Sequence, residues 1–130
     1  ATVPKITITL RKSYGGSHIV MGCKQLRADL NFAWPSSEIA VMGASGAVAV
    51  LCGKEAKAKK EAGEDVKAFL AEKEQEYTDK FANPYQAAQY GYIDDVIEPR
   101  NTRFRICRGL AQLATKRQSL PAKKHGCMPM

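Results

Sequence analysis

The most suggestive chemistry in the sequence lies in a turn, Tyr14-Gly15-Gly16-Ser17, between an alternating strand pattern and a helical one. Paired glycines break a strand and permit a tight turn. The first N–H groups of a helix have no partner within it, and they stabilise negatively charged oxygen. The turn therefore predicts an oxyanion-binding site made by backbone amides. The alternative is a plain strand-to-helix turn.

Side chains suited to catalysis are sparse. The sequence has no Gly-x-Ser-x-Gly, His-Glu-x-x-His, P-loop or Gly-x-Gly-x-x-Gly pattern. Asp94 and Asp95 are adjacent carboxylates, but neighbouring strand residues face opposite ways, so we expect no shared acid–base pair. His18 lacks a third group to orient it as a base, and we expect a packed or solvated imidazole.

The cysteines and histidines do not have the spacing of a metal site. Cys23, Cys52, Cys107 and Cys127 form no C-x-x-C pair, and His18 is far in sequence from His125. We expect no metal, a reducing compartment, and Cys52 and Cys107 as small core residues.

The elements that position the turn alternate between strand and helix patterns, which is typical of an α/β fold. Strands are expected at residues 5–11 and 38–42 and from Tyr92 to Ile97, with a short segment at residues 29–34. Ser17 is expected to cap a helix that runs to Leu26. Within residues 64–81, one face at helical spacing is formed by Val66, Phe69, Leu70, Tyr77 and Phe81. Further helical segments are expected at residues 47–51, 54–60, 64–81, 85–90 and 101–116. The last has Phe104, Cys107, Leu110 and Ala114 on one face, which we expect to pack on the core.

Length and composition limit the classes of protein to which the chain can belong. The chain has 130 residues, a formal charge of +7 and 45% hydrophobic residues, which indicates one folded domain. No apolar run approaches the length of a membrane helix, so we expect no direct membrane insertion. The chain has neither an initiator Met nor a secretory signal, and a strand pattern begins almost at once, which suggests a piece of a longer or processed protein. The positive charge fits an anionic partner or simply solvated helix faces.

Motifs spread over essentially the whole chain resemble the carboxyltransferase (β) subunits of biotin-dependent acyl-CoA carboxylases. The resemblance extends to propionyl-CoA carboxylase β, methylmalonyl-CoA carboxyltransferase and methylmalonyl-CoA decarboxylase α subunits. The motifs are VPKIT (3–7), RKSYGG (11–16), VMG (20–22), ADLNFAWP (28–35), EIAVMGA (38–44), KFANPY (80–85), GYIDDVIEP (91–99), TKRQ (115–118) and KKHG (123–126).

The resemblance implies a crotonase-like (ββα spiral) fold. Residues 1–118 would form the C-terminal portion of the second carboxyltransferase domain, and residues 119–130 an extended tail. The backbone N–H groups of Gly16 and Ser17 would form the oxyanion hole for biotin, with Tyr14 and Gly15 beside the biotin pocket. Ile19 matches a position that influences the length of the acyl chain accepted in that family. Carboxyl transfer would run between carboxybiotin and the α-carbon of a short acyl-CoA, most plausibly propionyl-CoA or methylmalonyl-CoA.

The same resemblance implies cofactors and partners. Biotin would arrive on a carrier protein, a coenzyme A thioester would be the substrate, and no metal would be needed. A biotin carboxylase or decarboxylase subunit would act with a homo-hexamer of the full-length chain, in the cytoplasm or the mitochondrial matrix. Nucleic acid is not an expected partner. Because an N-terminal domain would hold the acyl-CoA, we expect the isolated 130-residue chain to be inactive.

Two other functions remain open from the sequence. The positive charge would suit a basic, non-catalytic binding module, although no predicted strand face combines clustered aromatic and basic residues. Another crotonase-like acyl-CoA enzyme, such as a hydratase or thioesterase, would need a carboxylate pair near the thioester. The sequence offers no evident pair of that kind.

Overall fold

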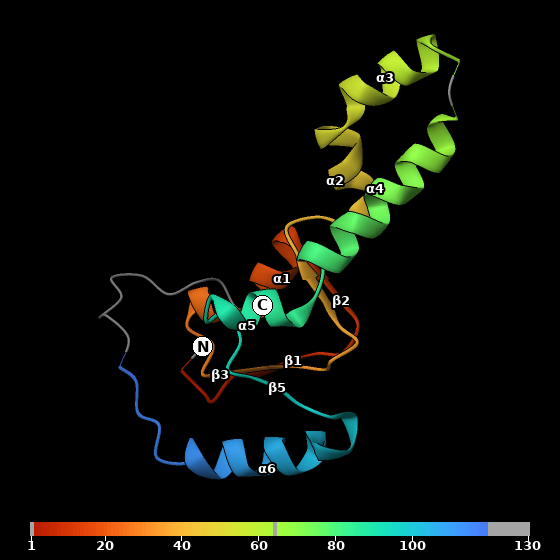
Figure 1. Ribbon diagram of the computed structural model, residues 1–130. Coiled ribbons are helices and arrows are strands. Elements are labelled where there is room, and N and C mark those ends of the chain that lie inside the picture. The colour runs from red at the N-terminus through yellow and green to blue at the C-terminus, as the bar shows by residue number, and fades with distance from the viewer. Residues whose placement is uncertain (1, 64, 120–130) are drawn as a thin grey trace, which may run out of the picture.

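Two small parallel sheets carry the fold in the computed structural model, which describes residues 2–63 and 65–119 (Figure 1). One sheet has the order β1-β3-β5 and the other pairs β2 with β4. The strands are β1 (Ile6–Thr9), β2 (Lys12–Tyr14), β3 (Leu30–Ala33), β4 (Glu38–Ala40) and β5 (Asp95–Val96). Helices alternate with these strands, so the α/β prediction is confirmed.

The alternating pattern over residues 5–11 predicted one strand, and the structure corrects this. The chain leaves the first sheet after Thr9 and enters the second sheet at Lys12. Residues 30–40 repeat the same path, with Pro35 between β3 and β4. Each of these segments thus contributes a strand to both sheets, and β2 delivers the chain directly to the glycine turn.

The core lies where the two sheets meet. Ala33 from β3 and Ile39 from β4 pack against Ala87 and Ile93, and all four are buried. The predicted strand at residues 92–97 is shorter in the structure, where β5 covers Asp95–Val96. The flanking N–H groups of Asp94 and Ile97 also donate to β3, at the carbonyls of Asn31 and Ala33. Ile93, near the start of the segment, is buried in the core.

Eight helical segments complete the fold of the described residues. They are α1 (Gly15–Val20), η1 (Lys24–Leu26), α2 (Ala44–Leu51), α3 (Gly53–Glu61), α4 (Val66–Phe81), α5 (Pro84–Gln89) and the pair η2 (Pro99–Asn101) and α6 (Thr102–Gln112). In the described part of the chain no helix combines the length and apolar character required to cross a membrane.

Helices α2, α3 and α4 form an arm that extends away from the sheets (Figure 1). Asp65 caps α4 by accepting hydrogen bonds from the backbone N–H groups of Lys67 and Ala68. The predicted apolar face of α4 is confirmed in part. Phe69 is half-buried, whereas Phe81, at the end nearest the sheets, is 48% exposed. The arm therefore leaves an aromatic side chain uncovered where it joins the body.

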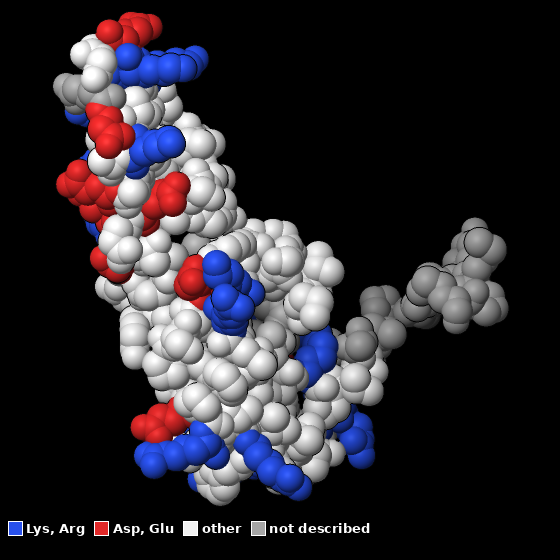
Figure 2. Space-filling model, turned by 90° about the vertical axis from the view of Figure 1, so that its right-hand side faces the viewer, with Lys and Arg blue, Asp and Glu red and all other residues white. Residues whose placement is uncertain are grey.

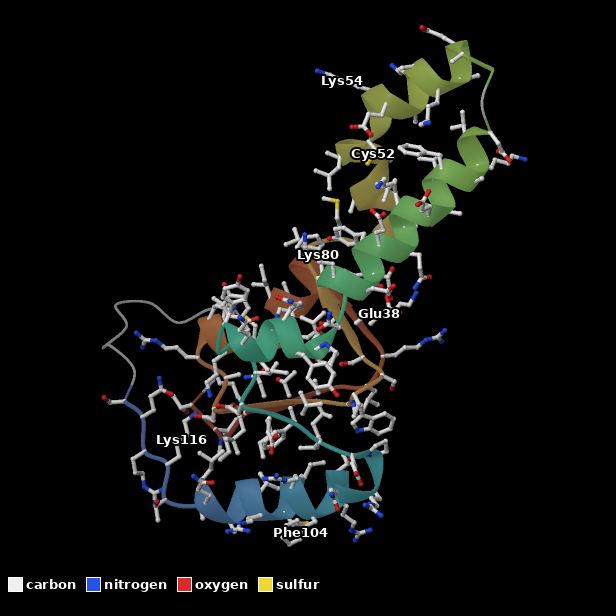
Figure 3. All side chains as sticks on the ribbon, viewed as in Figure 1. Glu38, Cys52, Lys54, Lys80, Phe104 and Lys116 are labelled. Atoms are coloured by element: carbon white, nitrogen blue, oxygen red, sulfur yellow. The ribbon has the colours of Figure 1, made fainter. Side chains whose placement is uncertain are left out.

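The predicted core face of α6 is wrong. Phe104 is 60% exposed and points away from the sheet (Figure 3), and Cys107 and Leu110 are also exposed. The buried residue is Gly109, where an added Cβ would lie 2.8 Å from Leu30 Cδ1. Glycine lets α6 approach β3 closely, so the contacting face is set by a residue that carries no hydrophobic signal.

The cysteine predictions also need correction. Cys52 is only half-buried and Cys107 is exposed, whereas Cys23 is fully buried. All three are free thiols. Cys127 and the rest of the predicted tail from residue 120 onward lie outside the described residues.

Charged side chains are divided between two regions. Figure 2 shows basic and acidic side chains interleaved along the arm and basic ones gathered around α6, with a mostly uncharged region between them. On the face shown, the charge of +7 is therefore not concentrated in one patch.

A partly buried ion pair joins the start of the fold to the segment after α6. The Lys116 ammonium lies 2.8 Å from the Asp29 carboxylate and donates a second bond to the Val3 carbonyl at 3.0 Å (Figure 3). The backbone N–H of Lys5 donates to the same carboxylate at 2.7 Å. Lys116 holds the pKa of Asp29 below its ordinary value.

Candidate functional site

The predicted glycine turn is the N-terminus of α1. Gly15 is the first helical residue and has a φ of +50°, which residues with a side chain rarely adopt. A Cβ atom here would lie 2.8 Å from the carbonyl oxygen of Val41, just after β4. The backbone dihedral and the close approach to this carbonyl both require glycine at this position.

The expected capping role of Ser17 is wrong. Tyr14 occupies the N-cap position, and no side chain caps the helix. Ser17 is the third residue of α1, and its hydroxyl donates to the Tyr14 carbonyl at 2.6 Å. The helix also stops at Val20 rather than at Leu26. The Ser17 hydroxyl therefore does not occupy the first backbone N–H groups of α1.

The amides at this end face open space. The first N–H groups of a helix lack partners within it, and among the described residues no backbone acceptor meets those of Gly16 and Ser17. Both residues are exposed, and no atom lies within 4 Å of a Cβ built on Gly16. Two adjacent donors that face open space can hold an oxygen carrying negative charge.

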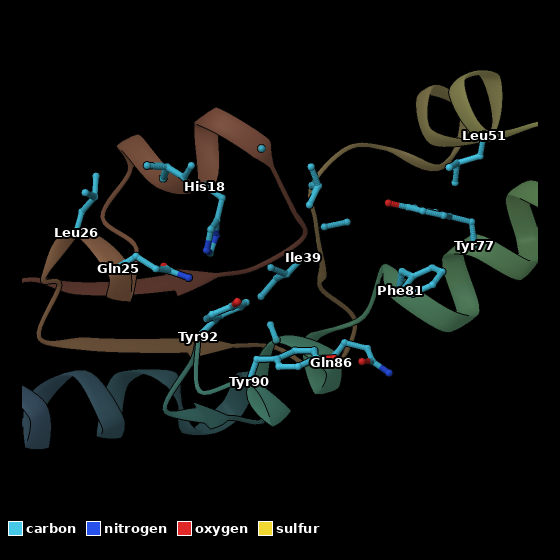
Figure 4. A pocket seen from close by; sticks show the side chains of 15 residues that line it. His18, Gln25, Leu26, Ile39, Leu51, Tyr77, Phe81, Gln86, Tyr90 and Tyr92 are labelled. Carbon is cyan, nitrogen blue, oxygen red and sulfur yellow. The ribbon is translucent and has the colours of Figure 1, made fainter.

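An open cavity of about 780 Å³ adjoins the turn (Figure 4). Its wall is mostly apolar and aromatic. It is formed by Gly15, His18, Ile19, Gln25, Leu26, Ile39, Ala40, Val41, Leu51, Tyr77, Phe81, Gln86, Ala87, Tyr90 and Tyr92. Among the residues selected from the sequence, Gly15 and Ile19 line the cavity, whereas Tyr14, Gly16 and Ser17 lie outside its lining.

Sequence reasoning missed most of this wall. Tyr77 and Phe81 belong to the helical face that was expected to be core, and Tyr90 and Tyr92 flank a turn. Periodicity cannot separate a core face from a cavity wall, because both are apolar and recur at the same spacing. The separation depends on how α4 and α5 are placed relative to the sheets.

Tyr14 has a structural role. Its hydroxyl donates to the Glu38 carboxylate on the neighbouring strand, and its ring lies 3.4 Å from a Cβ built on Gly43. Burial, reinforced by the Glu38 carboxylate, raises the pKa of Tyr14 to about 12. The phenol is therefore neutral at ordinary pH and ties β2 to β4 beside the turn.

His18 points from α1 into the cavity, between Gln25 and Ile39 (Figure 4). Its Nδ1 lies 2.9 Å from the Ser13 hydroxyl, five residues earlier in the chain. Burial lowers the pKa of His18 below its ordinary value of 6.5. The expectation that no group orients this imidazole is wrong, because Ser13, the middle residue of β2, contacts Nδ1 and orients the ring.

The two adjacent carboxylates have different partners. Asp94 accepts hydrogen bonds from Lys24 and from the backbone N–H of Asn31, whereas Asp95 pairs with Arg105 at 2.6 Å. Each carboxylate therefore pairs with its own cation. Within residues 2–63 and 65–119, no group of three or more His, Cys, Asp or Glu side chains could hold a metal ion.

Comparisons with known proteins give a consistent result. The profile of the carboxyl transferase domain family matches residues 1–128. The chain is 52% identical to the propionyl-CoA carboxylase beta chain of Saccharopolyspora erythraea over 130 residues, and 51% identical to the methylmalonyl-CoA decarboxylase subunit alpha of Propionigenium modestum. In both comparisons it covers 100% of itself and 24% of the relative.

A solved structure agrees with these relatives. The transcarboxylase 12S crystal structure, a hexamer with methylmalonyl-coenzyme A and methylmalonic acid bound, superposes with a TM-score of 0.85 at 54% identity. All of this chain and 24% of that one are covered. The chain therefore spans about a quarter of the length of the relatives it matches.

Proposed function

The chain belongs to the carboxyl transferase domain family and has its crotonase-like fold, and from that premise we propose that it forms the biotin side of a carboxyl-transfer site. The complete protein would transfer a carboxyl group between biotin and a short acyl-CoA, with propionyl-CoA or methylmalonyl-CoA as the favoured substrate. The relatives that share about half of its residues are named for these substrates.

The observation that carries this proposal is the pair of open amides at Gly16 and Ser17. A ureido oxygen is an acceptor that two converging N–H donors suit. The empty space at Gly16, where a Cβ would meet no atom, leaves room for a ring to approach the backbone. The strained Gly15 beside Val41 fixes the direction in which these donors point. The residues present therefore fit the group.

Different residues of the chain would contact biotin and the acyl group. Gly16 and Ser17 hold the ureido oxygen, and Ile19, which lines the cavity at 47% exposure, borders the space for the acyl chain. Carboxybiotin, when bound, supplies the carboxyl group in exchange for the α-proton of the thioester. The wall of this space is mostly apolar, and apolar surroundings strengthen hydrogen bonds to developing charge. Among the described lining residues there is no carboxylate, so a hydratase-type acid–base pair lacks support.

The remaining assignments follow from the family. We propose a biotin carrier and a biotin carboxylase or decarboxylase subunit as partners, a homo-hexamer of the complete chain, and a cytoplasmic or mitochondrial location. The acyl-CoA would be held mainly by a domain outside these residues. The isolated chain would therefore be inactive.

The test uses the complete polypeptide that contains these residues. Transfer of the carboxyl group from methylmalonyl-CoA or malonyl-CoA to biotin is measured, with avidin as the inhibitor of authentic transfer. Gly16→Pro removes one amide donor at the second residue of α1, where proline is tolerated in a helix. We expect a rate loss of about 10²–10³-fold.

Ser45→Pro is the matched control, because it changes the second residue of α2 and should leave the rate within about twofold, as no substrate role is assigned to that amide. A folded parent without transfer activity would overturn the proposed function. A normal rate in a folded Gly16→Pro protein would overturn the placement of the oxyanion hole.

A further inference from the structure

The His18 side chain is a polar group of the cavity wall that the proposed function leaves unused. We propose that His18 is a positioning residue for biotin, with Nε2 accepting a hydrogen bond from the ureido edge while Ser13 holds Nδ1. This inference rests on the proposed function. It concerns a side chain, whereas the oxyanion site uses backbone amides.

The geometry places His18 between the two parts of the proposed site. The residue directly follows the donors at Gly16 and Ser17 and directly precedes Ile19. Gly15 lines the same cavity as His18, so the cavity adjoins the amide pair. A ring whose ureido oxygen lies on those amides would extend into the cavity that the imidazole enters.

The Ser13 contact leaves one nitrogen for a ligand. An imidazole has two ring nitrogens, and Nδ1 is 2.9 Å from the Ser13 hydroxyl. With Nδ1–H donating to that hydroxyl, Nε2 carries a lone pair and can accept only one strong bond. Biotin offers a complementary pattern, because its ureido N–H can donate while its sulfur ring and aliphatic arm suit apolar walls such as Ile39 and Phe81.

The surroundings of His18 in the cavity are mostly uncharged. The other titratable side chains on the same wall are Tyr77, Tyr90 and Tyr92. No carboxylate or ammonium group is found among the described lining residues.

The elements that pack near α1 carry charges that have partners. On β2, Lys12 lies 3.9 Å from Glu38, and Tyr14 donates to the same carboxylate. On η1, Lys24 pairs with Asp94. Burial alone lowers the pKa of His18, so the imidazole is neutral near pH 7. Protonation would remove the Nε2 lone pair and place a charge in an apolar cavity.

Two substitutions by amide side chains distinguish the roles of Nδ1 and Nε2 of His18. His18→Asn places an amide near the position of Nδ1 and can keep the Ser13 bond, but it has no group near Nε2. His18→Gln reaches the position of Nε2 and gives up Nδ1. The dissociation constant for free biotin is measured by calorimetry on the complete polypeptide between pH 5 and pH 8, together with the KM for biotin in carboxyl transfer.

We expect wild-type affinity for biotin to weaken as the pH falls through the imidazole pKa. His18→Asn should bind about 3- to 10-fold more weakly at pH 8, the effect of one lost hydrogen bond, and His18→Gln should restore most of that loss. Both variants should lose the pH dependence. If the Asn variant does not fold, Ser13→Ala should weaken binding in the same direction by releasing the ring.

Equal affinities in the wild-type and His18→Asn proteins, or a pH dependence that persists in both variants, would overturn the role of His18. The proposed function would survive that result if Gly16→Pro still abolished transfer. A folded parent that neither binds biotin nor transfers carboxyl would overturn the proposed function and this inference together.

Discussion

The adjacent glycines at positions 15 and 16 should respond in opposite ways to the same substitution. Gly15→Ala forces alanine into a φ of +50° and places its Cβ 2.8 Å from the Val41 carbonyl oxygen. The left-handed conformation costs about 1–2 kcal/mol, and crowding against backbone adds about 1–3 kcal/mol. Local stability at α1 should therefore fall by at least about 2 kcal/mol.

Gly16→Ala meets no atom within 4 Å. Alanine in helical conformation loses less backbone entropy on folding than glycine, so this change should stabilise α1 by about 0.4–1 kcal/mol. The N–H donor remains, but the methyl group occupies the space proposed for the biotin ring. We therefore expect a higher KM for biotin with a more stable helix, whereas Gly15→Ala should lose both stability and activity.

Hydrogen exchange of a peptide spanning residues 14–21, measured by mass spectrometry on the complete polypeptide, checks this contrast. A loss of about 2 kcal/mol corresponds to roughly 30-fold faster exchange. Gly91→Ala is the control, followed in the peptide that contains residue 91. Gly91 has a φ of +72° and open space around its Cβ position, so this change shows the cost of the left-handed dihedral without crowding. The reasoning is refuted if Gly15→Ala exchanges at the wild-type rate, or if Gly16→Ala opens the helix as much as Gly15→Ala.

Two further predictions concern stability. The Lys116 ammonium lowers the pKa of Asp29 from its ordinary value of 3.8. The ion pair therefore stabilises the folded protein above pH 3.8, and this stabilisation is lost as the pH falls through the lower pKa of Asp29 in the folded state. Asp29→Asn should cost about 2 kcal/mol at pH 7 and flatten the acid limb of unfolding followed by circular dichroism, and an unchanged limb would contradict the pairing. Gly109→Ala gains about 1 kcal/mol of helix propensity, but its Cβ would lie 2.8 Å from Leu30 and 3.0 Å from Ile6. Because overpacking costs about 1–3 kcal/mol, the melting temperature should fall, and a rise would show that these side chains move aside freely.

The sequence predicted the glycine turn because its signal is local. Gly15 and Gly16 interrupt an alternating strand, and paired glycines favour a tight turn. The partner that makes Gly15 indispensable, the Val41 carbonyl, could not be predicted in the same way. It comes from β4, and only the parallel pairing of β2 with β4 brings it close.

The predictions from sequence were wrong where the local residue pattern and the tertiary contacts disagree. The alternation of residues 5–11 continues through the bend after Thr9, so it carries no sign that the chain changes sheets. The spacing of Phe104 and Leu110 predicted the buried face of α6, but Gly109 permits the closer packing. No group was expected to orient His18, because Ser13, five residues earlier, becomes its neighbour only in the folded chain.

The Asp29–Lys116 ion pair also bears on the order of events as the chain is synthesised. Its partners are 87 residues apart, and the bond from Lys116 to the Val3 carbonyl spans 113. At about 5–20 residues per second, Asp29 would be synthesised roughly 4–17 seconds before Lys116. During that interval the backbone N–H of Lys5 can already bind the carboxylate, so β1 and β3 can pair first. A contact that closes after the transition state changes the unfolding rate more than the folding rate. The ion pair would thus govern how long the folded state persists rather than how quickly it forms.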